Sequence, residues 1–244
     1  MKIAVISDIH GNVAALDAVL ADIGSRHVDQ IVNLGDICSG GLFPRETADR
    51  LMPLGLPTIR GNHERQLSDL APDRMGLSDR HAAATLRPEQ LAWMAALPTT
   101  LILFDDVRLV HGTPDSDLAY LLETVTGTGI RPATPAEVEE RAGDVEASVI
   151  LCGHTHLQRA MTLGDGRLIV NPGSVGLPAY SDDRPYPHRV ESGTPHARYA
   201  IVSNAGRGWT ADLIRVDYDW EQAARDAEAN GRSDWSSALR TGRV

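Results

Sequence analysis

Residues 1–20 read MKIAVISDIHGNVAALDAVL, and this stretch decides the fold class. The apolar run at 3–6 contains β-branched residues and predicts a strand. A short polar loop follows, and Asn12 is placed to cap a segment with helical periodicity. Residues 30–34, QIVNL, predict a second strand. Because a strand, a helix and a strand at this spacing form a βαβ unit, the sequence predicts an α/β protein.

The rest of the chain continues this alternation within one expected domain, residues 1–244. Helical patterns occupy 64–97 and 219–229, and a capping box with Pro135 at its first helical position predicts a helix that starts after Thr134. Further strands are expected at 57–59, 100–104, 107–111, 148–152, 167–171, 198–203 and 209–216. The segments near 64–97, 113–133 and 181–197 are expected to form lid-like excursions around a pocket.

Composition and charge restrict the class of partner. The 244 residues include 23 Lys+Arg and 33 Asp+Glu, a formal net charge of −10, and 42% are hydrophobic, which is typical of a soluble globular protein. No stretch reaches the roughly 18 consecutive apolar residues of a membrane span. The negative charge disfavours long nucleic acid and anionic membranes as partners. With only Cys38 and Cys152 and no signal-peptide pattern, we expect reduced thiols and a cytoplasmic location.

Five short segments place metal-type side chains directly after apolar strands. Ligands of α/β proteins bind beyond the carboxyl ends of the strands, so side chains distant in sequence can converge there. Residues two apart in an extended backbone also point the same way, so an Asp-x-His or His-x-His can offer two ligands to one site. Each segment alone has an ordinary explanation as a cap, a turn or a strand-end histidine, but five together favour a shared metal site. They are Asp8-Ile9-His10, Gly35-Asp36, Gly61-Asn62-His63-Glu64, His111-Gly112 and Gly153-His154-Thr155-His156.

The ligand types indicate which metals would bind. Asp and Asn oxygens with several imidazoles and no Cys favour borderline transition metals such as Mn, Fe, Co, Ni or Zn. Seven candidate ligands are more than one tetrahedral ion uses. Two ions about 3.5–4 Å apart, bridged by a carboxylate and a hydroxide, would use all of them and would serve an in-line displacement at phosphorus.

Taken in order, these motifs resemble the signature of the calcineurin-like metallophosphoesterase superfamily: D-x-H, G-D, G-N-H-[D/E], a single H, and G-H-x-H. The resemblance spans residues 8–156, is extended by NPGSVG at 171–176, and is strongest to small prokaryotic phosphodiesterases of the YfcE-like type. It implies a four-layer α/β/β/α sandwich of two mixed β-sheets flanked by helices. It also implies a dinuclear phosphodiesterase or broad-specificity phosphatase in which a metal-bridging hydroxide attacks phosphorus, with manganese among the candidate metals.

The resemblance also implies a role for each site residue. His63 would be the general acid or would stabilise charge on the phosphoryl group, so His63 and Asp36 are the implied catalytic residues. Asn62, His63 and Arg60 are the candidates for substrate binding. The implied ligands of the first metal are Asp8, His10, Asp36 and His156, and those of the second are Asp36, Asn62, His111 and His154, which makes Asp36 the bridge.

One departure from the superfamily pattern narrows the substrate. Phosphoprotein phosphatases of the superfamily continue G-D-x-x-D-R-G, whereas residues 35–41 read GDICSGG, so that phosphate-gripping arginine is missing. Arg60 matches their Arg-Gly-Asn-His-Glu form, although a strand-end arginine paired with an acid is the rival explanation. The expected partner is a small phosphoester, with nucleotides among the candidates.

Other functions stay open as alternatives. A phosphoprotein phosphatase or a dinucleoside polyphosphate phosphatase of the same superfamily would use the same metal centre. A catalytically retired binding scaffold is disfavoured, because such a protein usually loses ligands and here all seven ligand positions and His63 are filled. A nuclease acting on long nucleic acid is disfavoured by the net charge.

Overall fold

The computed structural model describes residues 1–206 and 208–244 and contains two mixed β-sheets. In the first sheet, β1 pairs in parallel with β2, as the βαβ pattern predicts, and antiparallel with β12. β12 in turn pairs antiparallel with β13. The strands, in spatial order, are β13 (Trp209–Val216), β12 (Ala197–Asn204), β1 (Lys2–Ile6) and β2 (Gln30–Asn33).

The second sheet has a parallel centre and antiparallel edges. β7 pairs in parallel with β4 and with β9, and β3 and β8 close the two edges in antiparallel fashion. The central strand β7 is fully buried, which is why its sequence is apolar without alternation. In spatial order the strands are β3 (Leu101–Leu103), β4 (Val107–Leu109), β7 (Val149–Leu151), β9 (Leu168–Pro172) and β8 (Gln158–Thr162).

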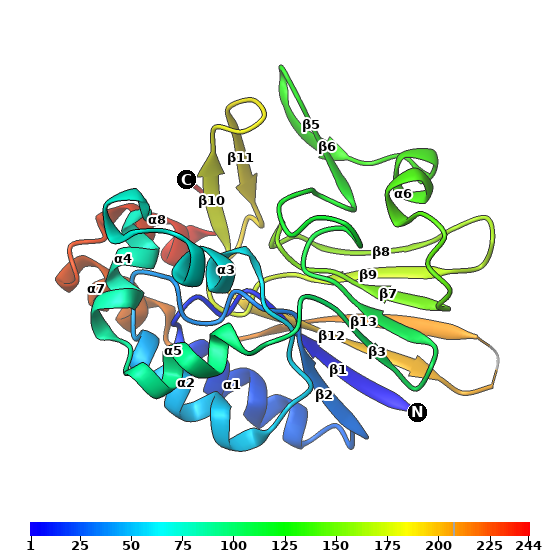
Figure 1. The fold of residues 1–244 in the computed structure, drawn as a ribbon, viewed down its shortest axis with the longest axis horizontal. Coiled ribbons are helices and arrows are strands. Elements are labelled where there is room, and N and C mark those ends of the chain that lie inside the picture. The colour runs from blue at the N-terminus through cyan, green and yellow to red at the C-terminus, as the bar shows by residue number, and fades with distance from the viewer. Residues whose placement is uncertain (207) are drawn as a thin grey trace.

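Three hydrophobic cores separate four layers. One core lies between the sheets and joins residues such as Val5 and Val32 to Val107 and Val149. A second packs α1 and its neighbours on the outer face of the first sheet, and a third packs α6 on the outer face of the second. Figure 1 shows α1 and α2 below the first sheet and α6 beside the second. The expected four-layer sandwich is therefore confirmed.

The helices begin where the sequence supplies caps. The Asn12 side chain accepts a hydrogen bond from the amide of Ala15, and Thr134 forms the expected capping box with Glu137. None of the helices described in residues 1–206 and 208–244 is long and apolar enough to cross a membrane. The helices are α1 (Val13–Gly24), α2 (Pro44–Leu51), η1 (Met52–Leu54), α3 (Asn62–Asp69), η2 (Pro72–Arg74), α4 (Leu77–Thr85), α5 (Pro88–Ala95), α6 (Pro135–Ala142), α7 (Trp220–Ala229) and α8 (Ser233–Thr241).

Two of the three expected excursions, 113–133 and 181–197, have more regular structure than the sequence suggested, whereas 64–97 is helical as expected. Segment 64–97 contributes most of α3 and all of η2, α4 and α5. Segment 113–133 contains a hairpin, β5 (Glu123–Thr126) and β6 (Gly129–Pro132), and 181–197 contains most of a second, β10 (Ala179–Asp182) and β11 (His188–Glu191). Figure 1 shows both hairpins projecting on the side opposite α1 and α2. The strand expected at 57–59 was wrong, because only an isolated bridge between Asn33 and Thr58 forms there.

Candidate metal centre

The five predicted segments meet at one end of the two sheets. Asp8 and His10 follow β1, Asp36 follows β2, His111 follows β4, and the two histidines of the 153–156 segment follow β7. Backbone hydrogen bonds fasten these loops together, from the amide of Asp8 to the carbonyl of Gly35 and from that of His10 to the carbonyl of Asp36, both at 3.0 Å. Both sheets therefore contribute to one cluster.

The backbone of this cluster is strained. Eight non-glycine residues of the described chain have positive φ, and five of them are predicted ligands, with φ between 52° and 68°. Left-handed backbone costs free energy for such residues and persists where surrounding structure enforces it, often at functional sites. The five are Asp8, His10, Asp36, His154 and His156.

The first group of candidate ligands consists of Asp8, His10 and His156, all buried. The Nδ1 atoms of His10 and His156 both lie 2.7 Å from backbone carbonyl oxygens, those of Ser39 and Leu177. Because a carbonyl only accepts hydrogen bonds, Nδ1 carries the proton of each neutral ring and Nε2 presents a lone pair. The two Nε2 atoms nevertheless face each other at 3.0 Å. Two lone pairs directed at one point beside a carboxylate fit a cation between them.

The second group consists of Asp36, His111 and His154, joined by Asn62. The amide oxygen of Asn62 lies 3.0–3.2 Å from Oδ2 of Asp36, Nε2 of His111 and Nδ1 of His154, all of which are acceptors when the two rings are neutral. Turning the amide over would satisfy them by hydrogen bonds, but an amide oxygen among acceptors is also the arrangement of a ligand set around a cation. We favour the latter, because the first group shows the same convergence.

Burial and neighbouring charges shift the pKa values of the histidines in different directions. Burial, together with the neighbouring His156, lowers the pKa of His10 to about 3, and burial with His111 lowers that of His154 to about 4. Both rings are therefore neutral, which is the form that binds metals. Burial opposes the charge on His111, but the carboxylate of Asp36 outweighs it and raises the pKa of His111 to about 10. Metal binding at the second group would therefore displace this proton.

Glu64 holds the Asp36 loop in place, a role that the sequence did not reveal. Its buried carboxylate accepts hydrogen bonds from the amides of Asp36, Ile37 and Gly61, each at 2.8 Å. Gly61 packs closely against Asp36, since a Cβ at Gly61 would overlap Oδ1 of Asp36. Glu64 was visible in the G-N-H-E motif, but its partners Asp36 and Ile37 lie 28 and 27 residues away, in a loop that only the folded chain brings near.

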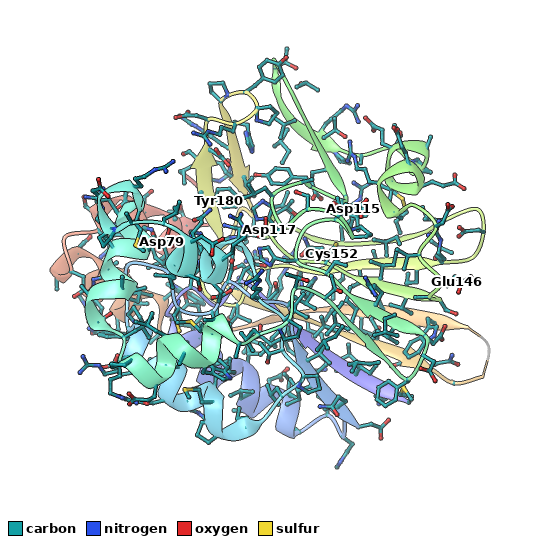
Figure 2. All side chains as sticks on the ribbon, in the orientation of Figure 1. Asp79, Asp115, Asp117, Glu146, Cys152 and Tyr180 are labelled. Atoms are coloured by element: carbon teal, nitrogen blue, oxygen red, sulfur yellow. The ribbon has the colours of Figure 1, made fainter. Side chains whose placement is uncertain are left out.

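His63 is oriented by an aspartate that the sequence also did not reveal. Its Nδ1 donates to Oδ1 of Asp79 at 2.6 Å, and Asp79 is 2% exposed at the start of α4. Burial lowers the pKa of His63, but Asp36 and Asp79 outweigh it and raise it to about 9. Figure 2 shows Asp79 beside α4. The contact leaves Nε2 of His63 as the nitrogen available to a substrate.

A cavity of about 1430 Å³ opens above both ligand groups, and His63 lines it. Its walls come from the two hairpins, the loop 113–120, α6 and the start of α8. Arg60 is not among the described residues that line the cavity, and its amide donates to the carbonyl of Pro98 at 2.9 Å. The predicted site residues in the lining are His10, Asp36, Asn62, His63, His154 and His156.

His154 connects the ligand cluster to this wall. Its Nε2 donates to the carbonyl of Leu118 at 3.1 Å, which leaves Nδ1 free as a ligand. Its own carbonyl accepts a hydrogen bond from the hydroxyl of Tyr180 at 3.1 Å, and Figure 2 shows Tyr180 by β10. Tyr180 also shares a 2.8 Å hydrogen bond with Tyr120, whose hydroxyl contacts His188 at 3.0 Å.

Comparisons with known proteins agree with this geometry. The sequence matches the family described as the calcineurin-like phosphoesterase superfamily domain over residues 1–187. The chain belongs to this superfamily. An uncharacterized protein of Methanocaldococcus jannaschii is 26% identical over 263 residues, covering 96% of this chain and 94% of that protein.

One of the solved structures shows the same fold over nearly the whole chain. The crystal structure of a metallophosphoesterase from Sphaerobacter thermophilus is 25% identical and has a TM-score of 0.75, covering 99% of this chain and all of that one. Yfce, a phosphoesterase from E. coli, is 19% identical with a TM-score of 0.45, covering 89% of this chain and 100% of its own. Our assignment to the calcineurin-like phosphoesterase superfamily rests on the family match and on the Sphaerobacter structure. Helices α7 and α8 lie beyond the matched residues, although α8 lines the cavity.

Proposed function

We propose that the protein is a phosphodiesterase or broad-specificity phosphatase that works with two divalent transition-metal ions. The observation that carries this proposal is the convergence of two separate ligand groups and one imidazole, His63, on a single cavity. A structural metal site would be closed by its protein ligands, whereas these groups lie at the floor of an open cavity. Such a floor suits a substrate that brings its own oxygen ligands.

The protein residues would divide the two ions between them. Asp8, His10 and His156 would hold the first, and Asn62, His111 and His154 the second. Asp36 would serve both, since its charge acts on His10 of the first group as well as on His111 of the second. When bound, the two ions would activate water and neutralise the phosphoryl oxygens, and manganese is our first candidate.

His63 would supply the proton for the leaving group. Asp79 fixes the ring through Nδ1, and the amide of His63 donates to Oδ1 of Asp36 at 3.0 Å. These two contacts support this role, because they hold the ring of a histidine that lines the cavity and leave its Nε2 for a substrate. A positioned acid of this kind contributes roughly 10²- to 10⁴-fold to rate.

Turnover of simple esters tests the proposal. With manganese added, the protein should bind about two equivalents of metal and hydrolyse bis-p-nitrophenyl phosphate, with p-nitrophenyl phosphate as the monoester comparison. His63→Ala should lower kcat by about 10²-fold or more while retaining metal. His27→Ala, at an exposed histidine outside the cavity, is the control. A protein that binds both metals yet turns over no phosphoester would instead support the binding-scaffold alternative.

A further inference from the structure

The cavity is much larger than the phosphoryl group that the floor would bind. Pockets for small-molecule ligands usually measure about 300–1,000 Å³, and this one measures about 1430 Å³. The space beyond the floor lies between β5, β10 and α8. The side chains there, rather than the metal ligands, must therefore determine which groups attached to the phosphoryl group can bind.

The acidic side chains of this wall outnumber the basic ones. Asp115, Glu140 and Asp182 line the cavity, and none is in an ion pair among the described residues. Glu123 and Asp234 also line the cavity, but burial raises the pKa of Glu123 to about 7 and Asp234 pairs with Arg232. The lining contains three arginines. An additional anionic group that lies against this wall, away from the metal ions, would therefore meet more carboxylates than guanidinium groups.

Two of the three arginines are already committed to the protein. The guanidinium of Arg141 donates to the carbonyl of Glu123 and to the hydroxyl of Thr124, both at 2.8 Å. That of Arg232 donates to Asp234 at 2.7 Å and to the hydroxyl of Ser78 at 3.0 Å. Arg184 is exposed and has no side-chain hydrogen bond within the described chain. Of the three arginines in the lining, Arg184 alone is therefore available to bind a second phosphoryl group, and it lies on an exposed turn.

The same wall offers uncharged contacts. Leu118 and Val125 line the cavity together with Tyr120 and Tyr180, whose hydroxyls bond to each other at 2.8 Å. Aromatic and aliphatic side chains of this kind bury the apolar parts of a ligand, such as an aryl ring or a nucleoside base. The wall is therefore better suited to a large neutral group than to a charged one.

We propose that the substrate is an ester with a single phosphoryl group, whose remaining parts carry no negative charge. The proposal rests on the proposed function and makes it narrower. It excludes dinucleoside polyphosphates and nucleoside di- and triphosphates, which would place further phosphates against the carboxylates of the wall. It retains diesters of one phosphate with nucleosides, aryl alcohols or other uncharged alcohols.

Two chromogenic esters that differ by one phosphate test the proposal. Thymidine 5′-(p-nitrophenyl phosphate) has one phosphoryl group, and its 3′-phosphorylated form has a second on the side away from the reaction. With manganese-loaded protein at about 0.15 M salt, the first should have a kcat/KM higher by about tenfold or more. Equal values, or a preference for the 3′-phosphorylated ester, would overturn the proposal while leaving the phosphoesterase function intact. Failure of both esters and of bis-p-nitrophenyl phosphate would overturn the proposed function and this inference together.

A neighbouring pair of aspartates supplies matched variants. Asp182 lines the cavity and Asp183 does not, although they are adjacent in the chain. Asp182→Asn keeps an oxygen to accept the hydrogen bond from the amide of Arg184, now 3.0 Å away, so the turn should persist. We expect Asp182→Asn to lower the ratio of the kcat/KM values for the two esters by about threefold. Asp183→Asn should change this ratio less. An unchanged preference in Asp182→Asn would show that the wall charge does not select the substrate.

Discussion

The floor of the cavity is built from loops that the sheets hold on both sides, whereas the wall is built from hairpins outside them. Six of the seven predicted ligands on the floor are at most 5% exposed. On the wall, β5–β6 and β10–β11 are each two-stranded sheets, and Leu118 and Tyr186 are 53% and 52% exposed. The candidate metal ligands, which need fixed positions, thus lie on buried loops. The residues that would contact the rest of the substrate lie on exposed hairpins, which tolerate sequence change.

The largest effect should come from crowding the floor. A Cβ at Gly153 would overlap the hydroxyl of Ser7 and lie 2.9 Å from Oδ2 of Asp8, so Gly153→Ala should displace a ligand. Misplacing a group at the reaction centre by about 1 Å costs on the order of 10²-fold in rate. Ester hydrolysis would measure this loss. Gly164→Ala is the control, because a Cβ there meets nothing within 4 Å. Equal activity in both variants would mean that the floor is not rigid.

Removing the charge of Glu64 should have the next largest effect. Glu64→Gln places an amide N–H₂ against at least one of the three backbone amides that the carboxylate now serves. We expect a loss of roughly 10- to 100-fold in metal affinity or activity, with Asp36 displaced. Isothermal titration with manganese would measure the affinity, and the exposed Glu46→Gln would be the control. Wild-type affinity in Glu64→Gln would show that Asp36 is positioned without it.

The difference between floor and wall also explains how far sequence reasoning succeeds. The convergence of the candidate ligands could be predicted because four of the five motifs follow an apolar strand, and parallel strands of one sheet end at the same edge. Asp79 could not, because it lies 16 residues from His63 in a segment with no motif, and only the packing of α4 brings them together. The pairing of ligands with individual metals came from the resemblance rather than from spacing.

The wall was the poorly predicted region for two further physical reasons. Residues 123–132, ETVTGTGIRP, have β-branched residues on both sides of a glycine-containing turn. This is a hairpin signal that the surrounding polar sequence obscured. Helix α8 has weak helix formers at its start, and it is stabilised by packing Trp235 and Leu239 against Leu42 and α7 rather than by propensity. Tertiary contacts therefore decide the structure of both elements.

A smaller effect should follow from uncoupling wall and floor. Tyr180→Phe removes the hydroxyl that donates to the carbonyl of His154, a ligand in the second group. One neutral hydrogen bond contributes about 1 kcal/mol, so we expect the manganese site formed by the second group to lose about fivefold in affinity. Tyr186→Phe, at an exposed tyrosine of the same hairpin connection, should leave both sites unchanged. Loss at both sites would show that the tyrosine supports the whole floor.

The least effect on turnover, but a measurable one on stability, is expected at Glu123, where the wall meets the floor. Burial raises its pKa to about 7, against the stabilising contacts of Thr155, Arg159 and Arg141. An unfolded glutamate titrates near 4.5, so the folded state binds more protons between pH 4.5 and 7. The stability from this proton is complete below pH 4.5 and is lost as the pH rises through 7.

Glu123→Gln should remove that dependence. Relative to the variant, the wild type should lose about 3 kcal/mol of unfolding free energy between pH 4.5 and 8, since each pKa unit corresponds to about 1.4 kcal/mol. Urea denaturation with EDTA present would measure the difference without a contribution from bound metal. If the unfolding free energies of wild type and variant depended on pH in the same way, Arg141 and Arg159 would be keeping Glu123 ionised. The wall would then carry one more fixed negative charge against a second phosphate.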